Sequence, residues 1–278
     1  MGAHDPRLNP HGNLDLRLNR QLRSYRREDP PPKRVKPIPI GLLLRAAETT
    51  RTESRPTQLV RACCDMMIIG FFFLMRSGEY ATSNETSHPF HLQDVEFYVS
   101  NHRLNTMSSP PAALQAATFV LLEFTTQKNA TRGEKIGHSR SRSPFFCPVE
   151  ALARRVLYLR QFGASPNTPI NAIYYNRTQY QLISTRAMTA YIRRIVAECG
   201  HEYGLHARDV EARSLRSSGA MALLCARIDT NLIQLVGRWR SDTMLQYLHV
   251  QAPPIMSPLA HAMTARGDFS FHPTADAA

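Results

Sequence analysis

The sequence predicts an α+β domain that is mainly helical and carries a small antiparallel sheet. Helices are indicated where apolar residues recur every three or four positions, as in residues 57–75 and 185–199. A strand is indicated by residues 95–99, in which Val, Phe and Val alternate with Glu and Tyr. The 278 residues suffice to bury one substantial core, so we expect a single main domain over residues 38–250.

The charge balance of the chain predicts a polyanionic partner. Lys and Arg number 34 against 22 Asp and Glu, which gives a net charge of +12. A membrane surface is the competing polyanion, but the sequence shows no amphipathic Lys-rich helix and no lipidation motif. The five cysteines are an odd number without zinc-like spacing and follow no signal peptide, so we expect reduced thiols in an intracellular protein.

The two ends of the chain are expected to lie outside the main domain. Residues 1–37 form a basic arm or linker, because arginines recur along residues 14–27 and a Glu-Asp-Pro-Pro-Pro stop follows. Such an arm is suited to following a row of phosphates. Residues 251–278 are expected to be a C-terminal tail.

Two helices are expected at the start of the main domain, over residues 41–50 and 57–75. The second contains ten consecutive apolar or small residues, from Met66 to Met75. Ten residues are too few to cross a bilayer, so the run predicts a buried core helix. It is followed by the sequence RSGE, in which Arg76 is placed to favour the helix C-terminus.

A β-hairpin is expected between residues 119 and 136. Residues 119–125 are an apolar run that predicts a strand, and residues 127–133 (QKNATRG) are rich in turn-forming residues. The return strand is expected to pass through Lys135 and Ile136. A lysine in such a turn is by itself most simply a solvated side chain.

Two further helices are expected after the hairpin. Pro148 is placed to occupy the first turn of one, whose buried face is marked by Leu152, Val156 and Leu159. The other covers residues 185–199, and residues 167–175 between them are expected to be loop or short extended chain.

Three short helices are expected in residues 212–250. Leu215 and Gly219 share one face of the first, and Asp229 or Thr230 can cap the second, which ends at Gly237. Ser241 is placed to cap the third, on which Met244, Tyr247 and Leu248 share a face. Four arginines lie between these apolar faces, near helix starts and loops: Arg213, Arg216, Arg238 and Arg240. The cluster predicts an anion-binding site.

The same stretch resembles the C-terminal active-site box of the tyrosine recombinases, the phage integrase family. The resemblance rests on Ser-Leu-Arg ending at Arg216, on Gly-Arg-Trp-Arg-Ser around Trp239, and on Tyr247 at a family-typical spacing from Arg216. Arg76 with Glu three residues later is similar to the first catalytic arginine motif of the family. The closest likeness is to the eukaryotic transposon-borne branch of the Crypton kind.

The resemblance implies a catalytic domain that cuts and rejoins DNA. Tyr247 would attack phosphorus and form a 3′-phosphotyrosyl bond, and Arg76 and Arg216 would hold the phosphate. A hairpin lysine would protonate the departing 5′-oxygen; Lys128 matches best and Lys135 is the alternative. Trp239 would take the place of the family's His or Trp beside the phosphate. An ungapped count back from Tyr247 places Arg238 there instead.

One position departs from the family pattern. The His-x-x-Arg motif reads RSLR here, so Arg213 stands where the histidine is expected. Arginine does not deprotonate in a protein and cannot serve as a general base. It can still hold a phosphate, and substitution at this place is tolerated in parts of the family.

The leading prediction is therefore site-specific DNA strand exchange by a mobile-element recombinase. The implied partners are double-stranded DNA and further copies of the chain, assembled as a tetramer on DNA, in the nucleus if the host is eukaryotic. The chemistry needs no cofactor and no metal. Residues 1–37 would be the last remnant of the family's DNA-clamping domain. The alternatives are a degenerate DNA-binding relative that no longer cleaves and a strand-relaxing topoisomerase of type IB.

Overall fold

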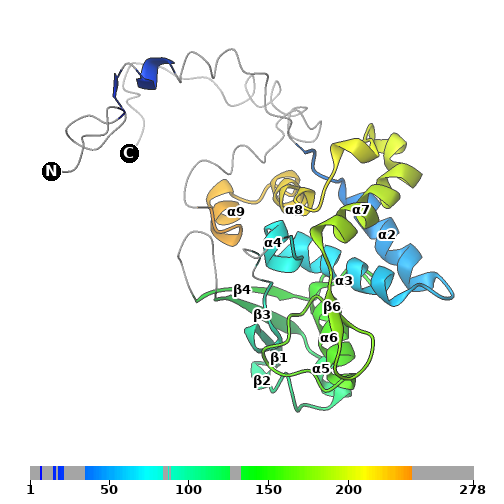
Figure 1. Cartoon of the computed structure of the whole chain (residues 1–278). Helices are drawn as coiled ribbons and strands as arrows, with labels where there is room; N and C mark the ends of the chain where they lie inside the picture. The colour runs from blue at the N-terminus through cyan, green and yellow to red at the C-terminus, as the bar shows by residue number, and fades with distance from the viewer. Residues whose placement is uncertain are drawn as a thin grey trace, which may run out of the picture. The chain divides into compact units, whose positions relative to one another are not determined.

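The computed structural model describes most of the main domain. The described residues are 7, 15–16, 18–21, 35–83, 87, 89–125 and 133–239 (Figure 1). Lys128, Arg240 and Tyr247 lie outside them. The chain divides into two compact units, Met1–Arg34 and Val35–Ala278. In the first unit, the Asn19 N–H donates to the Asp15 carbonyl at 2.9 Å.

Helix α3 (Gln58–Phe72) is the centre of the second unit. It packs against α2 (Ile40–Thr52), α6 (Pro148–Gln161), α7 (Thr185–Cys199) and α8 (Ser214–Cys225). Every residue from Ala62 to Phe71 is buried, which confirms the predicted core helix. The helix ends at Phe72 and not at Met75 as predicted, since Leu74 has a left-handed φ of 46°, and Arg76 is the N-cap of α4 (Ser77–Tyr80). The Thr57 hydroxyl caps its start by accepting from the Val60 N–H at 3.3 Å. The apolar run thus forms the element around which the other helices are arranged.

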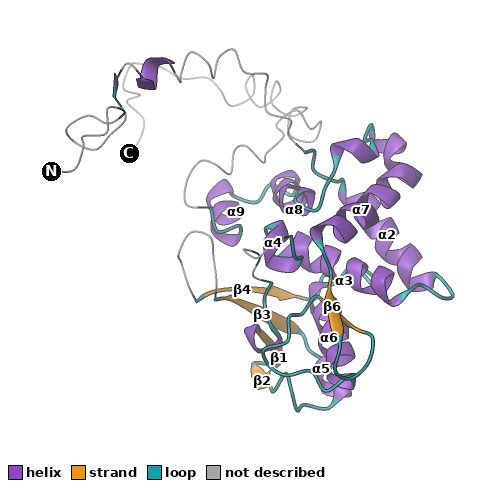
Figure 2. Ribbon diagram, viewed as in Figure 1, coloured by secondary structure: helices purple, strands orange, loops and turns teal. Residues whose placement is uncertain are grey.

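Four antiparallel strands form a sheet in the order β2-β1-β3-β4 (Figure 2). The strands are β1 (Val95–Val99), β2 (His102–Leu104), β3 (Phe119–Phe124) and β4 (Glu134–Ser139). The pairing of Leu122 with Ile136 confirms the predicted hairpin and its return strand. Buried and half-buried residues alternate strictly along β3, so one face of the sheet points to the core. The turn between β3 and β4 lies outside the described residues.

The remaining elements connect these layers. The described short helices are α4 (Ser77–Tyr80), α5 (Pro111–Gln115) and α9 (Thr230–Val236), with 3-10 turns at Leu92–Asp94, Gly200–Tyr203 and Ala207–Asp209. Strand β5 (Ala172–Tyr174) lies in the segment 167–175 that was expected to be loop or short extended chain, and it pairs with β6 (Tyr180–Leu182) in a two-stranded ribbon. No described helix is long and apolar enough to cross a membrane.

Helix α8 approaches α3 unusually closely, at Gly219. A Cβ atom at this position would lie 2.3 Å from the Phe71 carbonyl oxygen and 2.3 Å from Leu74 Cδ2. The hydroxyls of Ser217 and Ser218 are satisfied within the helix by the Ser214 carbonyl, so small polar residues pack here without unpaired hydroxyl groups. Small side chains therefore set the distance between the two helices.

Gly219→Ala is expected to destabilise the domain by about 2 kcal/mol. Overpacking costs roughly 1–3 kcal/mol, and helical alanine returns up to about 1 kcal/mol relative to glycine. The Phe71 carbonyl is part of α3 and cannot rotate away, so the upper end of that range applies. Denaturant unfolding measures the change. Gly78→Ala is the matched control, because the nearest atom to its Cβ would be Ser87 Oγ at 3.6 Å. Equal losses for the two variants would contradict the packing argument.

Candidate active site

Arg76 lies where α3 gives way to α4, and it is tied to Glu79. Its Nη1 donates to Glu79 Oε1 at 2.9 Å, and its backbone N–H donates to Glu79 Oε2 at 2.9 Å. The chain turns sharply just before, at Leu74, which has a left-handed φ of 46°. The contact with Glu79 holds the guanidinium in place, and 27% of the Arg76 side chain is exposed, so it remains accessible.

Arg238 reaches the same carboxylate from the opposite end of the domain sequence. Its Nη2 donates to Glu79 Oε2 at 2.9 Å and lies 3.3 Å from the Leu74 carbonyl oxygen. The guanidinium carbon is 3.5 Å from the centre of the Phe124 ring. Only 1% of the side chain is exposed. Burial lowers the pKa of Arg238 from its ordinary value, and the neighbouring Glu79 carboxylate opposes that shift.

Arg216 and Trp239 form a second contact pair beside the first. The buried Arg216 donates from Nη2 to the Gly237 carbonyl, and its guanidinium carbon is 4.3 Å from the centre of the Trp239 ring. Trp239 also packs in one cluster with Leu74, Ala220 and Ile233. Leu74 precedes Arg76 by two positions, so this cluster brings the neighbourhood of Arg76 to that of Arg216.

Gly237 is required by the packing of the Trp239 ring and not by a left-handed backbone conformation at the end of α9. It follows α9, as the sequence predicted, but its φ is −77°, which any residue can adopt. The left-handed residue is Arg238, with a φ of 58°. A Cβ atom on Gly237 would lie 1.6 Å from Trp239 Cζ3, so the indole ring occupies the place of the missing side chain.

Arg213 occupies the N-cap position of α8 and is largely exposed. Its Nε lies 3.0 Å from Glu211 Oε2, and 57% of its side chain is exposed. Arg216 follows one turn later on the same helix. Arg213 is thus paired with a surface carboxylate.

Lys135, the alternative to Lys128, is engaged in ion pairs on the open face of the sheet. Its Nζ lies 2.9 Å from Glu96 Oε1 and 3.3 Å from Glu123 Oε2. The hydrogen bond to Glu96 is the largest of the effects that raise the pKa of Lys135. A lysine held as a cation by two carboxylates is poorly placed to give up a proton. Lys128 lies outside the described residues.

In the described residues, the site therefore consists of two groups of arginine contacts near the C-terminal end of α3. Arg76, Glu79 and Arg238 form one group, and Arg216 with Trp239 forms the other. Guanidinium groups remain charged and offer paired donors, which suits a phosphate ligand. No group of three or more His, Cys, Asp or Glu side chains that could hold a metal ion occurs among the described residues.

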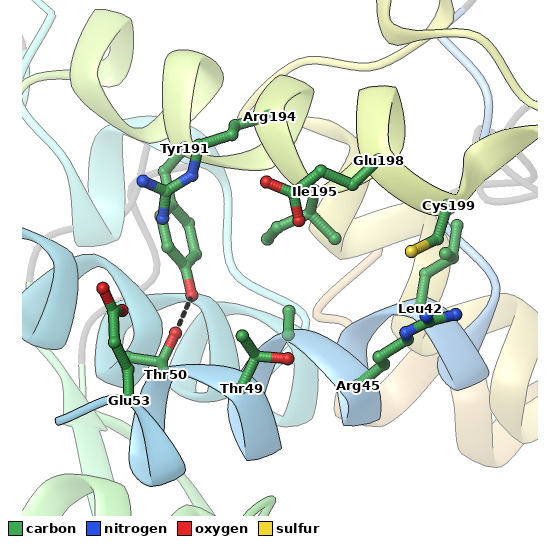
Figure 3. A pocket seen from close by; sticks show the side chains of 11 residues that line it. Leu42, Arg45, Thr49, Thr50, Glu53, Tyr191, Arg194, Ile195, Glu198 and Cys199 are labelled. Carbon is green, nitrogen blue, oxygen red and sulfur yellow. Dashed lines mark hydrogen bonds between the residues drawn. The ribbon is translucent and has the colours of Figure 1, made fainter. Parts of the chain in front are cut away.

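A separate cavity of about 210 Å³ lies between α2 and α7 (Figure 3). Its lining includes Arg45 and Arg194 together with Glu53 and Glu198. The Tyr191 hydroxyl, at 3.1 Å from the Thr50 hydroxyl, closes one side (Figure 3). None of the site residues predicted from the sequence and described here lines this cavity.

The domain resembles solved structures of site-specific recombinases. XerH bound to a palindromic difH substrate, in a post-cleavage complex, matches with a TM-score of 0.53 and 16% identity over 83% of this chain and 53% of that chain. XerH in a pre-cleavage complex with difH matches with a TM-score of 0.52 and 13% identity over 92% of this chain and 59% of that one. No protein-family model matches the sequence, and no curated protein matches it.

The fold is that of a tyrosine recombinase catalytic domain. The α+β class with a small antiparallel sheet was predicted correctly. The chain spans between half and three fifths of the length of the two XerH chains. At this level of identity the likeness establishes the fold, and the likeness to the Crypton branch stays a prediction.

His138 is a buried titratable residue of this domain. It lies on β4, with its ring 4.8 Å from the Phe73 ring centre, and its Nε2 is buried with no hydrogen-bond partner among the described residues. Burial lowers the pKa of His138 below its ordinary value of 6.5, and a hydrogen bond to the Phe72 backbone opposes the shift. The neutral imidazole is therefore the form that packs.

Domain stability is expected to fall on acidification because of His138. The folded-state pKa lies below the unfolded one, so the contribution is fully present above the unfolded pKa of about 6.5 and is lost as the pH falls through the folded pKa. Denaturant unfolding at pH values from about 7.5 down to about 5 measures the slope. His138→Phe should flatten it, whereas His102→Phe, at an exposed position, should keep it. An unchanged slope in His138→Phe would assign the acid sensitivity to other groups.

Proposed function

We propose that this protein is a site-specific DNA recombinase that breaks and rejoins DNA through a covalent tyrosine intermediate. The observation that carries the proposal is the meeting of two distant arginine motifs. Leu74, next but one to Arg76, packs on Trp239, whose ring lies 4.3 Å from the Arg216 guanidinium carbon. The fold shared with XerH supports the same conclusion.

Each residue has a distinct role in the proposed reaction. Tyr247 attacks the phosphorus, and the energy of the broken bond is conserved in a 3′-phosphotyrosyl bond. Arg76 and Arg216 neutralise charge on the nonbridging oxygens, which is the largest electrostatic demand of the step. Lys128 gives a proton to the departing 5′-oxygen, and Trp239 borders the phosphate. Religation reverses these steps on another strand end.

The finer assignments belong to the same proposal. We infer a mobile-element recombinase of the Crypton kind, assembled as a tetramer on double-stranded DNA and located in the nucleus of a eukaryotic host. The motif sequence around Trp239 supports the branch, and the net charge of +12 supports a nucleic-acid partner. The XerH structures were solved with DNA substrates, which supports the same kind of partner.

A second candidate is a DNA-binding relative that has lost cleavage. Arg213 favours it, because an arginine replaces the expected histidine and pairs with Glu211 at 3.0 Å. A guanidinium in this place keeps the affinity for phosphate and gives up proton transfer.

Covalent capture of DNA tests the proposal. The protein is incubated with nicked suicide duplexes drawn from a random-sequence library, and adducts that resist denaturation are isolated and sequenced. Recovered adducts enriched in one sequence would support a site-specific recombinase, and a two-site assay would then distinguish strand exchange from simple relaxation by a topoisomerase. Tight binding without any adduct would favour the second candidate.

A further inference from the structure

We propose that Arg238 is a positioning residue that holds Arg76 in place through the carboxylate they share, Glu79. The proposal rests on the proposed function only in taking Arg76 as a phosphate ligand. Glu79 uses one oxygen for the Arg76 guanidinium and the other for Arg238 Nη2, each at 2.9 Å. The second oxygen also accepts the Arg76 backbone N–H. The carboxylate is thus clamped between the two arginines.

Arg238 is the less accessible of the two arginines that bind Glu79. Its side chain is 1% exposed, against 27% for Arg76. The Phe124 ring covers the guanidinium at 3.5 Å. Of the two arginines on Glu79, Arg76 has the exposed side chain, so we expect Arg238 to act on DNA binding through Glu79 and Arg76.

The ion pair with Glu79 does not by itself account for a buried arginine at this position. A buried guanidinium is costly to desolvate, and an ion pair with one carboxylate offsets that cost poorly. Nε and Nη1 of Arg238 are buried without a hydrogen-bond partner among the described residues. An apolar residue over Phe124 would avoid both penalties. An arginine is explained at this position if it holds the Glu79 carboxylate in one orientation.

The contacts of Arg238 also place it between the segments that carry the other site residues. It follows α9 directly, and its Nη2 lies near the carbonyl oxygen of Leu74 at 3.3 Å, immediately before the Arg76 segment. Phe124 ends β3, the first strand of the hairpin. One side chain therefore connects the segment of Arg216 and Trp239 with that of Arg76 and with the base of the hairpin.

A double-mutant cycle of Arg76 and Arg238, measured as affinity for DNA, tests this assignment without depending on cleavage. All variants carry Tyr247→Phe, so that only noncovalent binding is measured, by fluorescence anisotropy with a labelled duplex of random sequence. Losing one charge-assisted phosphate contact should weaken binding about tenfold, so Arg76→Ala should do so in the parent. In the Arg238→Met background, Arg76→Ala should weaken binding by less than about twofold, because Arg76 is already misplaced.

Arg227→Met is the matched control. Arg227 also follows a helix with a left-handed φ, 60°, but is exposed, so the tenfold effect of Arg76→Ala should persist in its background. If Arg238→Met does not fold, Arg238→Gln replaces it, and the effect should then fall below about threefold. The proposal is overturned if Arg76→Ala still weakens DNA binding about tenfold in either Arg238 background. It is also overturned if Arg76→Ala leaves DNA binding unchanged in the parent. Failure of the recombinase proposal would be seen in a different experiment, as the absence of a covalent DNA adduct with the protein that retains Tyr247.

Discussion

Tyr247→Phe is expected to abolish the covalent protein–DNA adduct and to leave noncovalent binding of duplex DNA within about twofold. The substitution removes only the attacking hydroxyl, and without a nucleophile no phosphotyrosyl bond can form. The affinity for DNA depends chiefly on cationic contacts to phosphates, which the variant keeps. Denaturing electrophoresis of the suicide-duplex reaction measures the adduct, and anisotropy measures binding.

Two other tyrosines provide the comparison for this result. Tyr203 is 47% exposed, so Tyr203→Phe should keep the full yield of adduct. Tyr191 is buried, and burial raises the pKa of its hydroxyl, which makes it a poor nucleophile. Adduct that persists in Tyr247→Phe and disappears in Tyr203→Phe would reassign the nucleophile and refute the motif alignment.

Arg213→Ala is expected to slow cleavage about a hundredfold at saturating DNA. This follows if Arg213 is a third phosphate ligand in the proposed recombinase, because losing one oriented charged donor in such a site costs on the order of 3 kcal/mol. Stability should change little, because the ion pair with Glu211 is exposed and such pairs contribute about 0–1 kcal/mol. Single-turnover cleavage of a suicide duplex gives the rate.

Glu211→Gln separates the charge of Arg213 from its ion pair. This variant breaks the same pair, at 3.0 Å, and keeps the arginine, so cleavage should stay within about twofold of wild type. Arg213→His should cleave at least as fast as wild type, with a pH dependence near neutrality where imidazole titrates. Equal rates in wild type, Arg213→Ala and Arg213→His would leave Arg213 only as a surface charge.

The fold could be predicted from the sequence where a pattern is local. The apolar run ending at Met75 predicted α3, and the polar turn between two apolar segments predicted the pairing of β3 with β4. Strand β5 lies in a segment predicted to be loop or short extended chain, but its pairing with β6 was not predicted, because three-residue strands show too little alternation to distinguish them from loop.

The candidate site was predictable as a set of residue types but not as a set of contacts. The arginine motifs and Trp239 stood out by their order and spacing. The burial of Arg238 could not be foreseen, because arginine is rarely buried and its partner Glu79 is 159 positions away. The role of Gly237 was also missed, since only the position of the Trp239 ring shows why a side chain is excluded there.

Trp239 is the only tryptophan in the chain, and this gives the protein a built-in optical probe. Indole emission depends on the polarity and charge around the ring, and this ring is 8% exposed and lies against a guanidinium. The emission spectrum of the whole protein therefore reports on one place, the contact between Arg216 and the segment after α9. Any movement of that contact can be followed in time without a label.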